Sequence, residues 1–261
     1  MLCPAGICNV AQKFGDNATA LYHTDGLIGH PGWDIHCGYG SPIEAPFDMT
    51  IYSVIGTDSE LIGAEGYTQV GAIVETPLET FEWIIGHCDP TCKMGPVTKG
   101  TVIATEANHG PVYDGQTQIT LAMQKAGDRR GAHRHYQKRP VLKVSKTAGG
   151  TYLNAYGFYK DPAGNYYQIY APSNGFNGCT DWMAPLFNRD LFIGRSGYDV
   201  YLLQKALVLE GFATFTPTGN FGPLTIAALS KYQSHYKLTP TAGYCGPKTR
   251  AVLNAAYKPL P

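Results

Sequence analysis

The sequence carries little charge, and neither sign predominates. Only 15% of its 261 residues are Asp, Glu, Lys or Arg, and the 20 basic and 20 acidic residues cancel to a formal net charge of zero. An excess of positive charge that could attract a nucleic acid is therefore missing. A run of apolar residues long enough to cross a bilayer is missing as well. We expect no nucleic acid and no membrane among the partners of this chain.

Two short histidine motifs, about a hundred residues apart in the sequence, indicate a metal site. The first runs from His30 to Asp34 and contains a Pro-Gly pair, which favours a turn over a helix. The second is His133-Arg134-His135; in a strand, residues two apart point to the same face. Catalytic zinc is usually held by three nitrogen or oxygen donors, with the fourth position left to water. The motifs supply three donors and a spare imidazole for proton transfer.

A fifth candidate is His87, which follows a run from Thr80 to Gly86 that is typical of a buried strand. A single histidine is most often an ordinary surface or hydrogen-bonded residue. The joint pattern of the two motifs and His87 is what favours a site for hydrolysis by a metal-activated water.

At these residues the sequence resembles the lysostaphin-type zinc endopeptidases, which cut peptide cross-links in bacterial peptidoglycan. The resemblance covers about residues 1–140 and includes Gly40–Asp48 and Lys99–Ala104. It implies an antiparallel β-rich domain with one catalytic zinc ion, bound by His30, Asp34 and His135, and with His87 and His133 as catalytic residues beside the metal. The chain departs from the family pattern at Arg134, where the family usually has Leu.

Three short helices around a small core are predicted near the C-terminus. The first covers Asp199 to Leu207, with Asp199 placed to cap it and Gly211 placed to end it. The segments Gly222–Leu229 and Gly246–Leu253 repeat one pattern, each with Pro in the first helical turn. Here the chain resembles the three-helix peptidoglycan-binding domain that is often fused to cell-wall hydrolases, over about residues 194–257.

The expected fold class is α+β with two domains. Residues 1–190 are assigned to an antiparallel β-rich zinc endopeptidase domain and residues 194–261 to a small three-helix bundle that binds peptidoglycan. An aromatic-rich β-hairpin is expected around 146–180, with its turn at Asp161–Asn165. Its aromatic side chains either contact sugar or peptide, or are present because aromatic residues favour strands.

Seven cysteines form an odd set, so at least one lacks a partner within the chain. A protein made in a reducing cytosol keeps most of its cysteines as thiols. Cys88 and Cys92 lie close to His87 in the sequence, and with Cys37 they could form a structural zinc site or a disulfide. The alternative is that they are small buried hydrophobic residues.

Together the two resemblances imply a phage endolysin-like zinc metalloendopeptidase that hydrolyses peptide cross-links of peptidoglycan and lyses the cell wall. The alternatives are an N-acetylmuramoyl-L-alanine amidase-type hydrolase and a noncatalytic wall-binding protein. The N-terminus, Met1 to Cys8, lacks the basic start and apolar core of a secretory signal. We therefore expect a protein made in the host cytoplasm that reaches the wall once the membrane is permeabilised; a virion-borne lysin is the other possibility. The chain is expected to be a monomer.

Overall fold

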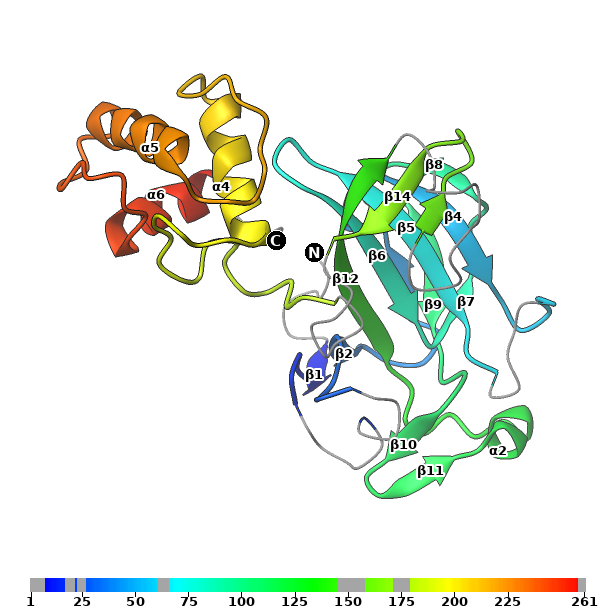
Figure 1. Ribbon diagram of the computed structural model, residues 1–261. Coiled ribbons are helices and arrows are strands. Elements are labelled where there is room, and N and C mark those ends of the chain that lie inside the picture. Colours follow the sequence, from blue (N-terminus) through cyan, green and yellow to red (C-terminus); the bar gives the residue numbers. More distant parts are fainter. Residues whose placement is uncertain are drawn as a thin grey trace. The chain divides into compact units, whose positions relative to one another are not determined.

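A computed structural model describes residues 8–16, 22, 27–60, 66–144, 158–170 and 179–257. The chain divides into two compact units, which we call the β unit (Met1–Glu75 and Thr80–Asp181) and the helical unit (Thr76–Glu79 and Trp182–Pro261). Antiparallel strands build the first and three helices dominate the second (Figure 1). The predicted α+β fold class is confirmed. Within the described ranges, no helix is both long and apolar enough to span a bilayer.

A nine-stranded sheet forms the body of the β unit, and every pairing in it is antiparallel. Its main path runs through seven strands: β1 (Asn9–Gln12), β2 (Trp33–His36), β12 (Arg134–Val144), β6 (Thr80–Gly86), β5 (Gln69–Glu75), β4 (Met49–Ile55) and β8 (Gly95–Val97). The long strand β12 lies between β2 and β6. It therefore joins the two parts of the sequence that carry the first histidine motif and His87.

Three smaller elements complete the β unit. A three-stranded sheet joins β3 (Pro42–Glu44), β9 (Val102–Glu106) and β7 (Cys88–Pro90). The hairpin of β10 (Val112–Asp114) and β11 (Thr117–Ile119) precedes the short helix α2 (Leu121–Lys125). The side chain of Thr120 caps this helix by accepting from the Met123 amide.

Aromatic side chains fill the core against the central strands. Phe81 and Trp83 on β6 are at most 1% exposed, as is Tyr136 on β12. Phe47 meets the rings of Phe81 and Trp83 edge to face, at centroid distances of 5.7 and 5.5 Å. Such tilted contacts are the favoured geometry for aromatic pairs. The core thus fixes β6 and β12 as the rigid support of the histidines at their ends.

The predicted aromatic hairpin is present where it can be described. Strands β13 (Phe158–Lys160) and β14 (Tyr166–Ile169) pair around the Asp161–Asn165 turn, and β14 also pairs with β12. The buried Tyr167 packs with Ile73, Val141 and Ile169, so this aromatic residue has a structural role. The rest of the predicted 146–180 segment, residues 146–157 and 171–178, lies outside the described residues.

The helical unit consists of α4 (Tyr198–Leu209), α5 (Pro223–His235) and α6 (Pro247–Ala256). Prolines at the starts of α5 and α6 occupy the first helical turn, as predicted. Gly211 follows the end of α4 with a φ of 79°, also as predicted. The prediction that Asp199 caps α4 is wrong. Gly197 holds the cap position, and Asp199 lies in the first turn, where it pairs with Arg189.

The sequence repeat of the helical unit corresponds to a repeated hydrogen-bond pattern. The buried side chain of Gln204 donates to the Asn220 carbonyl at 2.8 Å and to the Thr225 hydroxyl at 2.9 Å. Gln233 makes the equivalent bond to the Thr249 hydroxyl at 3.0 Å. A buried amide left without partners is costly, so each glutamine fixes the turn before the next helix.

Candidate metal centre

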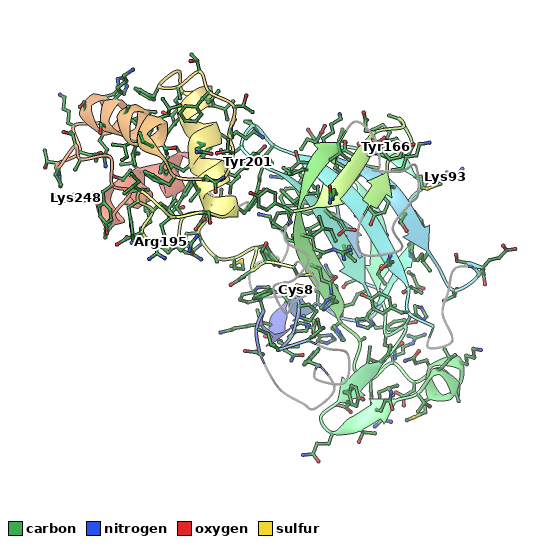
Figure 2. The ribbon with its side chains drawn as sticks, viewed as in Figure 1. Cys8, Lys93, Tyr166, Arg195, Tyr201 and Lys248 are labelled. Carbon is green, nitrogen blue, oxygen red and sulfur yellow. A yellow bond between two sulfur atoms is a disulfide. The ribbon has the colours of Figure 1, made fainter. Side chains whose placement is uncertain are left out.

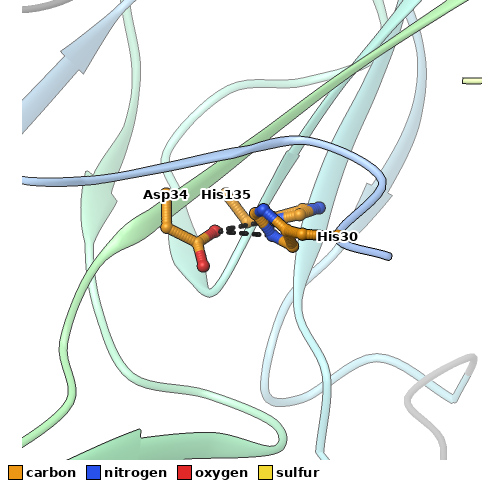
Figure 3. Close-up of side chains that lie close together, drawn as sticks. All are labelled: His30, Asp34 and His135. Atoms are coloured by element: carbon orange, nitrogen blue, oxygen red, sulfur yellow. Dashed lines mark hydrogen bonds and ion pairs between the residues drawn. The ribbon is translucent and has the colours of Figure 1, made fainter. Parts of the chain in front are cut away.

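Three side chains from two distant segments converge in the β unit (Figure 3). Oδ1 of Asp34 lies 2.6 Å from Nδ1 of His135 and 3.3 Å from Nε2 of His30. The two imidazole nitrogens are 3.0 Å apart. His30, Asp34 and His135 are at most 7% exposed. The three potential ligand atoms therefore point at one common position inside the protein.

The backbone brings these residues together by strand pairing. His135 on β12 lies directly opposite Asp34 on β2 in the antiparallel register. His30 is outside a helix and precedes a turn, as predicted from its Pro-Gly pair. A Cβ on Gly32 would collide with the Tyr136 carbonyl and come within 2.8 Å of the His135 ring. Only glycine allows the turn to pass this close to the ring.

The segment after β1 orients the His30 ring. Nδ1 of His30 lies 3.2 Å from the carbonyl oxygen of Lys13, so this nitrogen carries the proton and donates. The His30 backbone is held by Gly15, whose amide donates to it, and by Asp16, whose carbonyl accepts from it. Nε2 of His30 is then the unprotonated atom that faces Asp34 and His135. A backbone carbonyl behind a ligating histidine is the usual means of fixing its tautomer.

The charges of the three side chains suit a divalent cation. Burial alone would raise the pKa of Asp34, but His133, His135 and the hydrogen bond from His135 hold it well below its usual value. Burial lowers the pKa of His135 and keeps its ring neutral. One carboxylate and two imidazoles form a donor set typical of zinc with one open position. The residues present therefore fit one zinc ion. Among the described residues, they are the only group of three or more His, Cys, Asp or Glu side chains placed to hold a metal.

His87 and His133 lie beside the three donors. Nε2 of His133 is 3.5 Å from Oδ1 of Asp34, and the His87 ring is 4.6 Å from that of His133 and 6.0 Å from that of His135. Both rings bond a backbone carbonyl through Nδ1, His87 that of His109 at 2.5 Å and His133 that of Gly131 at 2.8 Å. Because Nδ1 is the donor in each bond, Nε2 is the atom of each neutral ring that can accept a proton. The structure thus places all five predicted residues in one cluster.

His87 follows β6 in an unusual backbone conformation. Its φ of 54° lies in the left-handed region, which non-glycine residues rarely adopt. Its amide donates to the Thr68 carbonyl at 3.1 Å, and its carbonyl accepts from the Ala107 amide at 3.0 Å. These bonds on both sides hold the strained residue in place, and such strain is typical of functional positions.

Tyr67 lies next to His87, although sequence reasoning did not single it out. The two rings meet edge to face with centroids 4.8 Å apart. The hydroxyl of Tyr67 fills the space where a Cβ of Gly86 would be, and Gly86 pairs with His135 across β6 and β12. Because paired residues in a sheet project to the same face, this hydroxyl lies on the face that carries His135. The only sequence signal was the glycine that precedes His87.

A buried ion pair supports the second histidine motif. Arg134 lies between His133 and His135, and its Nε donates to Oε2 of Glu106 at 3.0 Å. Glu106 also accepts from the amides of Cys37 and Gly38 at 2.9 and 3.0 Å, just after the strand that carries Asp34. Both charged side chains are buried. We call this arrangement the Glu106–Arg134 clamp, because it joins the two segments that supply metal donors.

The cysteines are arranged differently from the grouping considered above. Cys37 forms a disulfide with Cys8, and Cys88 and Cys92 are free thiols. Pairing of Asn9 with His36 across β1 and β2 brings the two flanking cysteines side by side, and sequence spacing does not reveal this pairing. Cys88 is fully buried, and burial raises the pKa of its thiol to about 12. It is a small hydrophobic core residue, as the alternative reading held.

Residues 196–253 match the family model described as a putative peptidoglycan binding domain. The sequence is 39% identical to the N-terminal domain of SleB over 27% of this chain and 96% of that domain, with a TM-score of 0.26. Among solved structures, LytU is 22% identical over 59% of this chain and 80% of its own, with a TM-score of 0.36. The catalytic domain of lysostaphin from Staphylococcus simulans is 18% identical over 59% of this chain and 89% of its own, with a TM-score of 0.34. No curated protein matches the sequence.

Proposed function

We propose that the β unit is a zinc-dependent endopeptidase that hydrolyses peptide cross-links of bacterial peptidoglycan, and that the helical unit anchors it to the wall. The observation that carries this proposal is the five-residue cluster. His30, Asp34 and His135 form a group that could hold a metal ion, and His87 and His133 lie beside it with Nδ1 bonded to backbone carbonyls. Metal-assisted hydrolysis of an amide uses these two kinds of group, a ligand set for the metal and imidazoles for proton transfer.

The chemistry follows from the position of each group. Bound zinc supplies a Lewis acid that polarises a carbonyl and makes water acidic near neutral pH. Hydrolysis breaks the C–N bond of the amide, adds the oxygen of water to the carbonyl carbon and requires a proton on the leaving amine. Nε2 of His87 or His133 can accept the proton of the attacking water and pass it to that amine. Both rings are fixed by their Nδ1 bonds, so no side-chain reorientation is needed.

The helical unit supports the choice of substrate. Its residues 196–253 match the putative peptidoglycan binding domain, within the region that the sequence motifs resemble. A wall-bound tether raises the concentration of substrate around the β unit without any new catalytic contact. This arrangement favours a cross-link in an insoluble wall over a soluble peptide as the substrate.

The test separates metal binding from proton transfer. His135→Ala is expected to lose bound zinc and activity, whereas His133→Ala and His87→Ala are expected to keep stoichiometric zinc and lose turnover. Zinc content is measured by elemental analysis and turnover by release of soluble fragments from purified walls. His235→Ala, in the helical unit, is the matched control and should keep both. Full activity in His135→Ala, or loss of zinc from the control, would contradict the assignment.

A further inference from the structure

Two aromatic side chains lie side by side on the surface of the helical unit. Phe192 and Tyr244 are 37% and 38% exposed, and their ring centroids are 6.2 Å apart with the planes tilted by 33°. They extend from a short antiparallel bridge between Leu191 and Cys245, both fully buried. Since side chains alternate between faces along extended backbone, the neighbours of these buried residues point outward.

Polar contacts hold the Tyr244 ring in one position. Its hydroxyl donates to the Asp190 carboxylate, which Arg250 holds by a bond of 2.9 Å. The ring lies against Gly246, where a Cβ would collide with it. These contacts fix the orientation of the ring, which is 38% exposed to solvent. Fixing a contact residue before binding reduces the entropy lost on binding.

A cation lies beside the Phe192 ring. The guanidinium of Arg195 lies over its ring, 4.6 Å from the centroid, and Arg195 itself is on the surface (labelled in Figure 2). Aromatic rings flanked by hydrogen-bonding groups suit a ligand with both apolar and polar surfaces. A sugar has this character, because its C–H faces stack on rings and its hydroxyl and acetamido groups form hydrogen bonds.

The repeat shows that the fold does not require an aromatic side chain at position 244. Gly219–Pro223 and Gly243–Pro247 are equivalent turns, and Tyr244 corresponds to Asn220. The carbonyls of both residues accept from the buried glutamine of the preceding helix, at 2.8 Å for Asn220 and 2.7 Å for Tyr244. The backbone role is thus the same with either side chain. An exposed, fixed ring in only one of the two turns calls for another explanation.

We propose that Phe192, Tyr244 and Arg195 form a saccharide-binding platform that stacks on the glycan strand of peptidoglycan. The proposal rests on the proposed wall-anchoring function of the helical unit and names the part of the wall that this unit contacts. The ring faces bind the apolar faces of successive sugars, and Arg195 donates to their oxygen atoms. The stem peptide is not the ligand of this platform.

The experiment measures binding of the full chain to purified insoluble peptidoglycan, in the presence of a chelator so that no hydrolysis interferes. Tyr244→Ala and Phe192→Ala are each expected to weaken binding by about tenfold, as for aromatic residues at the centre of an interface. Tyr244→Phe keeps the ring and should stay within about threefold of the parent chain. Thermal unfolding of each variant shows that the helical unit is still folded.

Tyr236→Ala is the matched control. Tyr236 is 41% exposed, belongs to the same unit, and its hydroxyl donates to the Glu210 carboxylate at 2.8 Å. It resembles Tyr244 in exposure and in its bond to a carboxylate, but it is not part of the platform. This variant should bind walls as tightly as the parent chain.

A soluble probe identifies the ligand. A β-1,4-linked N-acetylglucosamine tetrasaccharide should compete with walls for the parent chain, whereas a stem peptide without sugar should not. Equal binding by Tyr244→Ala and the parent chain, or competition by the peptide alone, would overturn the platform and leave wall anchoring in place. Failure of the parent chain to bind walls at all would overturn both proposals.

Discussion

Replacing Glu106 with Gln removes the charge from the carboxylate that joins the two donor-bearing segments. The side chain is fully buried, and its oxygens accept from two backbone amides and from Arg134. The variant leaves a buried guanidinium without its counter-charge, and breaking one side of a buried pair costs about 3–5 kcal/mol. For a unit of this size, that lowers its unfolding temperature by roughly 6–20 °C.

Calorimetry of the full chain checks this prediction, because the helical unit provides an internal reference that should be unaffected. The double variant Glu106→Gln with Arg134→Leu removes both charges and should recover at least about 2 kcal/mol of the loss. Zinc affinity should fall in the single variant, because the clamp holds the segments after Asp34 and before His135. A single-variant loss below about 1 kcal/mol, or an equal loss in the double variant, would refute the clamp as a stabilising element.

Three further outcomes follow from the structure. Gly86→Ala should lower turnover and keep zinc, because its new Cβ displaces the Tyr67 hydroxyl; loss of zinc would mean that this position acts on the metal donors. At pH 8, iodoacetamide should modify the half-buried Cys92 well before Cys88. The buried Cys88 thiol has a pKa raised to about 12, so it stays protonated until the pH approaches that value. Peptide mapping that finds both cysteines modified together would contradict this. Gln204→Ala should destabilise the helical unit by about 2–4 kcal/mol in urea unfolding, because it removes a buried amide that hydrogen-bonds the turn before α5. An unchanged urea midpoint would show that this amide does not stabilise the unit.

The candidate site could be located from the sequence because its residues belong to compact motifs. H-x-x-x-D around a turn and H-x-H in extended backbone each place two side chains on one side of the chain, and the strand before His87 is strongly apolar. Pairing of β2 with β12 is what brings the two motifs together. Tyr67 and Glu106 have no such signal. Each acts through a contact that exists only once β6, β9 and β12 are assembled. No local pattern in the sequence therefore predicts the role of either residue.

Local rules succeeded for helices and failed where tertiary contacts compete. Proline at the first turn and Gly211 at the end of α4 were predicted correctly, because both depend on backbone conformation alone. Asp199 was assigned to the cap because its residue type favours that position. In the folded unit Arg189 binds its carboxylate instead, and the partner lies ten residues earlier in the sequence. The Cys8–Cys37 disulfide was missed for the same kind of reason, since it depends on strand register.

The most direct test of the central claim is digestion of purified peptidoglycan by the full chain, with and without a zinc chelator and with zinc added back, followed by mass spectrometry of the released fragments. The account predicts new peptide amino termini that disappear on chelation and return with zinc. Cleavage at the lactyl amide would make the enzyme an amidase, and release that persists in chelator, or no release at all, would contradict the proposed zinc endopeptidase.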